Sequence, residues 1–365
     1  MTKKILIIIL LLFFSAAYSV NADNLALDSF ELQTSEGENV KSIAQDILKG
    51  EWKWDINDII SKALGLLFSS LKNNISLISM MIIVSLVSSL LLNLKTAFSS
   101  ETADVGFYAA YIIVAVLGAK GVGIAIEYGT ELTRQLDVYV KTIIPVVLSV
   151  SMASGAIISG AVVQPLIIGI SQVIAFVVTQ WLIPVLSVIC AMSVVNNLNG
   201  KGDLSGIIML LQKTVRWTCG ILMTAFVGIM TVQCMITPAL DSVAGKMTRY
   251  AIANFVPVVG GLISESVSVV AGYASALKGA LGGAGIITAV VLCIKPLSEI
   301  ASIAILYNIT SAVLRPVCDK RIFGLLGSFG QIVSSLLIMV IMMMLMFVIN
   351  VTSAVNISGL GSVIQ

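Results

Sequence analysis

Long apolar segments separated by short polar breaks dominate the chain from residue 75 to residue 351. Each segment is close to the roughly 20 residues that a helix needs to cross a hydrocarbon layer of about 30 Å. The pattern predicts an all-α, polytopic bundle of about eight transmembrane helices. The predicted spans are residues 75–94, 107–126, 142–163, 166–188, 220–236, 255–274, 286–306 and 332–351.

The segment 255–274 is the weakest of these predicted spans. Pro257, Gly260 and Gly261 interrupt it, and such breaks favour a broken or re-entrant segment that lines a cavity. If this segment does not cross the membrane, the bundle has seven spans, and every later helix is inverted.

The N-terminus has the pattern of a secretory signal peptide. Lys3 and Lys4 precede an apolar run that is too short to span a bilayer, and small residues up to Ala22 offer a cleavage site. We expect residues 1–22 to direct export, whether they are cleaved or remain as an anchor. Residues 23–74 should then lie on the outer face of the membrane.

Residues 55–71 of this exported segment have the periodicity of an amphipathic helix. Ile60, Leu64 and Leu67 fall on its apolar stripe, whereas Asp58 lies off it. One hypothesis is that the helix binds a partner or the membrane surface, with Ile60, Leu64 and Leu67 as partner-binding residues. The other is a plain lead-in helix that packs on the bundle.

Basic residues suggest how the spans are oriented. With an exported N-terminus, eight spans place the loops at Lys95, Lys246 and Arg315 in the cytoplasm, as the positive-inside rule favours. Lys201 and Arg216 are then exported, against that rule.

Weak internal matches suggest a duplication in the membrane part. Pro145 and Pro257, and Pro184 and Pro296, are each 112 residues apart. Three spans in each copy would invert one copy relative to the other. The predicted organisation is two spans with a loop in 75–141, repeat unit 1 in 142–238 and repeat unit 2 in 239–365.

Four charged residues fall within or at the ends of apolar segments, where an unpaired charge costs at least about 2.5 kcal/mol: Lys120, Glu265, Lys295 and Glu299. Lys295 and Glu299 have i, i+4 spacing and can meet on one helix face, and Pro296 frees a backbone carbonyl nearby. They could line a polar path, or form a local pair in which Lys295 extends to the interface. The predicted path-lining or hinge set is Pro257, Gly260, Gly261, Lys295, Pro296 and Glu299.

Small residues within the spans predict close helix packing. Gly118, Gly121 and Gly123 are one such group, and in lipid they let helices approach within a chain or between copies.

Composition supports the membrane assignment and excludes several functions. The chain is 58% hydrophobic and 11% charged, with a mean hydropathy of +1.04, whereas a soluble domain has about 25% charged residues. The net charge of +2 argues against nucleic-acid binding. Without histidine, and with its five cysteines scattered, the chain gives no sign of a metal site, a cofactor or catalytic residues. We expect a protein that is not an enzyme.

Specific motifs resemble the stage III sporulation protein AE family of endospore-forming bacteria. They are residues 250–261 (YAIANFVPVVGG), Lys295-Pro296, and residues 315–319 (RPVCD). The order of signal peptide, exported lead-in and spans is also similar to that family over nearly the whole chain.

The resemblance implies a multi-pass protein of the mother-cell membrane around the forespore. It implies a channel-like or secretion-like complex with the other stage III sporulation A operon proteins and, indirectly, stage II sporulation protein Q. The complex would support late forespore development, and the chain could assemble as a homo-oligomer. The alternative, from the inverted repeat, is a stand-alone secondary transporter for a small solute or ion.

Overall fold

The computed structural model describes residues 56–93, 100–153, 157–199, 204–255 and 260–356. Every regular element in these ranges is a helix, which confirms the all-α prediction. The elements are α4 (Ile56–Asn93), α5 (Ser100–Ala153), α6 (Ile157–Val177), η2 (Val178–Leu182), α7 (Ile183–Asn199), α8 (Ser205–Phe255), α9 (Gly260–Leu314) and α10 (Lys320–Asn356). The predicted signal peptide, residues 1–22, lies outside the described residues.

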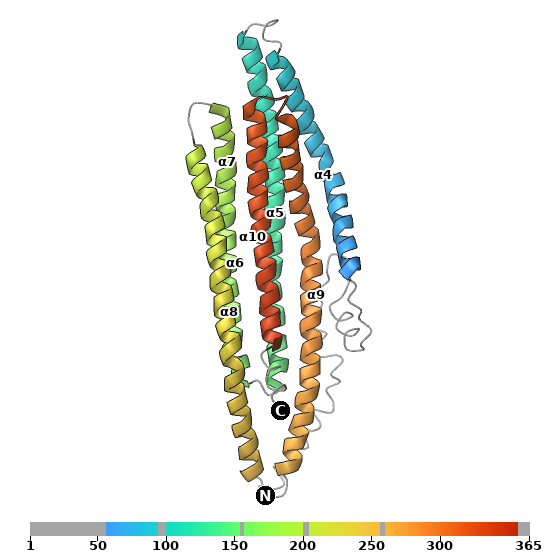
Figure 1. Ribbon diagram of the computed structural model, residues 1–365, viewed down its shortest axis with the longest axis vertical. Helices are drawn as coiled ribbons and strands as arrows, with labels where there is room; N and C mark the ends of the chain where they lie inside the picture. The colour runs from blue at the N-terminus through green and yellow to red at the C-terminus, as the bar shows by residue number, and fades with distance from the viewer. Residues whose placement is uncertain (1–55, 94–99, 154–156, 200–203, 256–259, 357–365) are drawn as a thin grey trace.

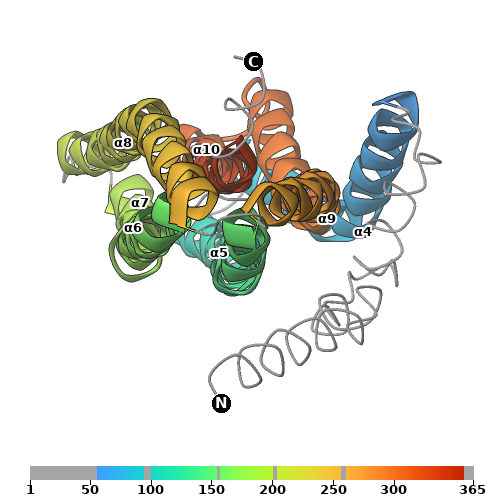
Figure 2. The same ribbon diagram turned by 90° about the horizontal axis from the view of Figure 1, so that it is seen from below.

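The helices form an elongated up-and-down bundle (Figure 1). Successive helices run in opposite directions along the long axis, and α6, η2 and α7 together make one traverse. In the view along the bundle, α10 lies at the centre, with α5, α6, α7, α8 and α9 around it and α4 at the edge (Figure 2). The side chains of α10 that are fully buried include Phe329, Met339 and Phe347, so the centre of the bundle is a packed apolar core.

Six helical stretches are long and apolar enough to cross a membrane, within the described part of the chain. They are Ala63–Leu90, Val105–Met152, Pro165–Leu198, Ser205–Gln233, Ala280–Leu314 and Lys320–Ala354. The structure therefore does not confirm the predicted eight spans.

Two features of the sequence explain this difference. The predicted span 107–126, the predicted loop after it and the start of span 142–163 all belong to the continuous helix α5. The weakest predicted span, 255–274, falls on the end of α8 and the beginning of α9 and includes residues that are not described.

The inverted repeat is not confirmed either. Pro184 lies in α7 and Pro296 in α9, and these two helices run in the same direction (Figure 1). The predicted boundaries after residues 141 and 238 also fall inside the continuous helices α5 and α8.

The exported amphipathic helix predicted for residues 55–71 is the beginning of α4, which continues without interruption through the first span. Further along the chain, the π-helical segment η2 precedes Pro184. The backbone N–H of Ile183 donates to the carbonyl of Val178, five residues earlier. Because Pro184 has no N–H and its ring crowds the preceding turn, a wider turn at this point is physically reasonable.

Two glycines allow α5 to pack closely against its neighbours, as predicted. A Cβ at Gly118 would overlap the ring of Phe329 on α10, and one at Gly121 would overlap the hydroxyl of Tyr307 on α9. The Tyr307 hydroxyl donates to the carbonyl of Gly118 at 2.8 Å. At Gly123 nothing lies within 4 Å of the corresponding position, so this third glycine has no such role.

Candidate functional site

A polar cluster joins α4 to α9 in the middle of their apolar surfaces. Asn74 of α4 lies with its Nδ2 atom 3.0 Å from Oε2 of Glu299 and 3.2 Å from Oγ of Ser302, both on α9. The same nitrogen is 2.9 Å from the carbonyl oxygen of Ser70. We call these four residues, Ser70, Asn74, Glu299 and Ser302, the α4–α9 polar seam.

Helical spacing brings the members of the seam together. Ser70 and Asn74 are four residues apart on α4, and Glu299 and Ser302 are three apart on α9, so each pair lies on one face of its helix. The Ser302 hydroxyl also donates to the carbonyl of Glu299 at 2.8 Å. The two faces meet because α4 and α9 run side by side in the same direction (Figure 1).

Glu299 is the chemically unusual member of the seam. It is half-buried within the candidate span Ala280–Leu314. In the described part of the chain, the salt bridges join Glu131 to Arg134, Asp137 to Lys141 and Asp319 to Arg321, so Glu299 has no cationic partner there. An ionisable side chain within a membrane helix usually indicates function, because its cost must be offset by partners or water.

The structure brings together only part of the predicted path-lining set. Lys295, Pro296 and Glu299 share one turn of α9, but Lys295 is exposed and Glu299 turns to Asn74 rather than to Lys295. Gly260 and Gly261 begin the same helix, so at 1.5 Å per residue they lie about 50 Å along the axis from Lys295. The surroundings of these two glycines, and Pro257 itself, lie outside the described residues.

A second polar region was not predicted. It is a charged face on α5, made of Lys120, Glu127, Glu131, Arg134, Asp137 and Lys141. We call it the α5 charged face.

Two of its contacts are ion pairs along the helix. Arg134 donates to Glu131 at 2.6 Å, and Lys141 donates to Asp137 at 2.6 Å. The sequence contained the signal, because spacings of three, four and seven residues place these charges on one side of a helix. The eight-span prediction instead assigns residues 127–141 to the loop between the spans 107–126 and 142–163.

The α4–α9 polar seam and the α5 charged face lie at similar depths in the bundle. Tyr307 of α9 contacts Gly118 of α5, and the Tyr139 hydroxyl of α5 donates to the carbonyl of Gly285 of α9 at 3.4 Å. These contacts fix an antiparallel register in which Lys295 and Glu299 lie near the level of Tyr128.

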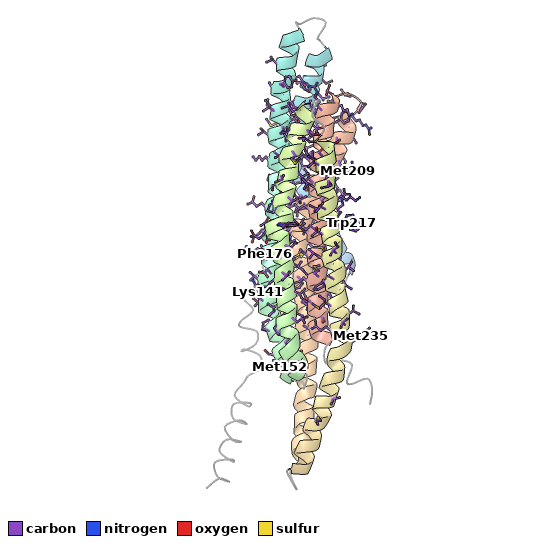
Figure 3. All side chains as sticks on the ribbon, turned by 90° about the vertical axis from the view of Figure 1, so that its left-hand side faces the viewer. Lys141, Met152, Phe176, Met209, Trp217 and Met235 are labelled. Atoms are coloured by element: carbon purple, nitrogen blue, oxygen red, sulfur yellow. The ribbon has the colours of Figure 1, made fainter. Side chains whose placement is uncertain are left out.

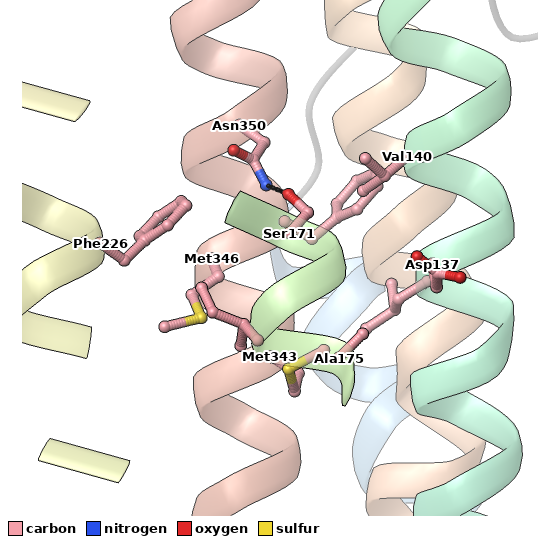
Figure 4. A pocket seen from close by; sticks show the side chains of 11 residues that line it. Asp137, Val140, Ser171, Ala175, Phe226, Met343, Met346 and Asn350 are labelled. Atoms are coloured by element: carbon pink, nitrogen blue, oxygen red, sulfur yellow. Dashed lines mark hydrogen bonds between the residues drawn. The ribbon is translucent and has the colours of Figure 1, made fainter. Parts of the chain in front are cut away.

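A third polar contact joins α10 to α6. Asn350 donates to the Ser171 hydroxyl at 2.9 Å, while its own Oδ1 atom is buried without a hydrogen-bond partner among the described residues (Figure 4). The adjoining cavity has a volume of about 20 Å³ and is lined mainly by apolar side chains, including Phe226 and Met343. Because this volume accommodates about one water molecule, the cavity is too small for a solute.

Together, these features define a class of protein: a polytopic, all-helical bundle of membrane type, with a packed centre and polar groups between and outside its helices. The chain belongs to the stage III sporulation protein AE family, whose sequence model matches residues 38–358. The stage III sporulation protein AE of Bacillus subtilis (strain 168) is a relative with 21% identity over 326 residues, which cover 88% of this chain and 81% of the relative. No solved structure matches the chain.

Proposed function

We propose that this chain is a non-enzymatic component of a membrane channel or secretion-like complex that connects the mother cell with the forespore. Membership of the stage III sporulation protein AE family over most of the chain carries this proposal. The expected partners are the other stage III sporulation A operon proteins and, indirectly, stage II sporulation protein Q. The expected location is the mother-cell membrane around the forespore.

The α4–α9 polar seam supports a role in a polar path through the membrane. Asn74 is a neutral donor, so it stabilises the Glu299 carboxylate without cancelling its charge. Lys295 is exposed one turn away on the same helix. A half-buried acidic side chain beside an exposed lysine suits a wet boundary better than a lipid contact.

The alternative of a stand-alone transporter has less support. It depended on an inverted repeat with proline-broken helices, and Pro184 and Pro296 lie in helices that run in the same direction.

The proposal is tested with the tagged full-length chain, expressed in sporulating cells of its own host. After purification in mild detergent, the other operon products should co-purify with it. Glu299→Gln should leave this assembly intact but lower spore yield, because the amide oxygen still accepts from Asn74 while the charge is lost. Asp319→Asn is the matched acid-to-amide control, since it lies in the α9–α10 turn and asparagine also caps a helix well.

A different result would overturn the proposal. If the chain purifies without any operon product and, reconstituted alone, moves a solute in a manner that Glu299→Gln abolishes, it is a transporter. If Glu299→Gln and Asp319→Asn both leave spore yield unchanged, the α4–α9 polar seam is not part of a path.

A further inference from the structure

Most of the α5 charged face is on the outside of the bundle, opposite the side of α5 that joins the core, while Asp137 at its edge also lines the cavity beside Asn350. Arg134 is 66% exposed and Lys141 is 44% exposed. The other side of the helix is fully buried, with Val122, Ala125 and Leu132 in the core. The helix is therefore amphipathic. Both ion pairs on its polar side join residues of α5 to each other, and neither reaches another described helix.

At the same depth, other sides of the bundle are apolar. The cavity beside Asn350 is lined by Asp137 of α5, Ala175 of α6 and Phe226 of α8, which places these residues at one level. Near this level α6 exposes Phe176 (66%), and α8 exposes Ile229 (42%). Lys141 and Phe176 lie in the same middle part of the bundle (Figure 3).

The contrast between the charged α5 side and the apolar α6 and α8 sides indicates what surrounds the middle of the bundle. If this level were in water, α6 and α8 would expose large apolar side chains to it. If lipid surrounded every side, the α5 charged face would lie in hydrocarbon, where charged side chains rarely occur unless they face protein or a water-filled cavity. Lipid on the α6 and α8 sides, with water and protein on the α5 side, satisfies both surfaces.

Among the described residues, the middle of a single chain offers no room for a polar path. The centre is filled by α10, whose Phe329, Leu336 and Phe347 side chains are fully buried against α5 and α9. The cavity beside Asn350 has a volume of only about 20 Å³. A path bordered by the α5 charged face must therefore have at least one wall from outside the described residues of the chain.

We propose that copies of this chain assemble through the α5 charged face and enclose a water-filled path between them. Three basic and three acidic residues make up this face, so it is complementary to a second copy rather than to a partner of one charge. The water-filled path depends on the proposed function of the chain. The assembly of copies through the α5 charged face does not depend on it.

Introduced cysteines test this proposal in the purified full-length chain, reconstituted in lipid vesicles. Val138 is 42% exposed and lies among the charged residues, so Val138→Cys keeps all six charges. Phe176→Cys is the matched control at similar depth on the α6 side. The unmodified chain is the blank, since its described cysteines, Cys190, Cys219, Cys293 and Cys318, are buried.

A charged, membrane-impermeant thiosulfonate should modify Val138→Cys roughly tenfold faster than Phe176→Cys, because thiolates form in water and not in lipid. A short bifunctional thiosulfonate should link Val138→Cys into a dimer of two copies and leave Phe176→Cys monomeric. Equal rates for the two variants would overturn the water-filled path. Fast modification of Val138→Cys without a dimer would overturn assembly through this face.

These outcomes are independent of the sporulation complex. The vesicles contain no other operon product, so a chain that fails to co-purify with those products can still form the cross-linked dimer. Conversely, a chain that co-purifies with them but remains monomeric in the vesicles would overturn only the assembly of copies.

Discussion

At Gly121, the absence of a side chain lets α5 and α9 approach until Tyr307 packs directly on the α5 backbone. The Tyr307 hydroxyl then reaches the carbonyl of Gly118 at 2.8 Å. This bond adds a second acceptor contact to a helical carbonyl and satisfies a hydroxyl that is buried in the core. The small size of Gly121 therefore allows both the close approach of the two helices and the hydrogen bond of the buried Tyr307 hydroxyl.

Gly121→Ala should destabilise the bundle by about 1–3 kcal/mol, because the new methyl group forces Tyr307 away from its site in a packed core. Gly123→Ala, two residues later, should be neutral or stabilising by up to about 1 kcal/mol, since alanine is the better helix former and nothing lies within 4 Å. Thermal unfolding of the two purified variants in the same detergent measures the difference. Equal melting temperatures for the two variants would show that α5 and α9 do not approach closely here.

The residue scale also shows what a sequence alone can and cannot predict. Glu299 was identified as a functional candidate because a carboxylate inside an apolar run is costly. Its hydrogen-bond partner, Asn74, was not identified, because Asn74 lies 225 residues away in the sequence and no local spacing connects the two residues. The predicted partner, Lys295, has the helical spacing for a pair with Glu299. The packing of α9 on α4 instead turns the Glu299 side chain towards Asn74.

At the scale of elements, helix type was predictable and helix length was not. Apolar periodicity correctly indicated helices throughout, but charged residues between apolar runs were interpreted as breaks. In α5 the charges from Glu127 to Lys141 lie on the exposed side of a helix whose other side is held by the core. Packing against the core therefore keeps these residues of α5 helical, although their polarity alone predicts a loop.

The first half of α4 allows a test of the partner-binding hypothesis. Among the residues predicted to bind a partner, Leu64 is 50% exposed, Leu67 is half-buried, and the side chain of Ile60 lies outside the described residues. Phe68, one turn after Leu64, is 67% exposed. Leu64 and Phe68 therefore form an apolar surface that the described bundle leaves uncovered.

Leu64→Ala combined with Phe68→Ala should abolish co-purification with the operon products while changing the melting temperature of the chain little, because exposed side chains contribute little to packing and alanine introduces no charge into the candidate span Ala63–Leu90. Ser69→Ala, on an exposed polar position of the same helix, is the control and should co-purify normally. A double variant that still co-purifies would leave α4 as a plain lead-in helix.

At the scale of the whole molecule, the six-helix arrangement changes the expected orientation in the membrane. The C-terminal ends of α4, α7 and α9 lie at one end of the bundle (Figure 1). Arg315 directly follows the end of α9, and Lys320 and Arg321 begin α10 beside it, so this end carries a cluster of basic residues. The positive-inside rule makes it the cytoplasmic end.

This orientation predicts which introduced cysteines a membrane-impermeant maleimide can reach in intact cells. Met247, on the lower part of α8, is 69% exposed, and Met247→Cys should be labelled from outside. Ser205→Cys, at the start of α8, should be labelled only after permeabilisation. The eight-span scheme predicts the reverse for both positions, so the pair separates the two arrangements.

Val317→Cys is the control for this comparison, because both schemes place it in the cytoplasm. Its neighbour Cys318 should not interfere. Burial, with a smaller contribution from Asp319, raises the pKa of the Cys318 thiol, so this thiol stays protonated and unreactive at neutral pH. Labelling of Ser205→Cys in intact cells, with Val317→Cys still protected, would mean that α7 does not return the chain to the cytoplasmic end. The six-helix orientation would then be wrong, whatever the protein's role in the spore.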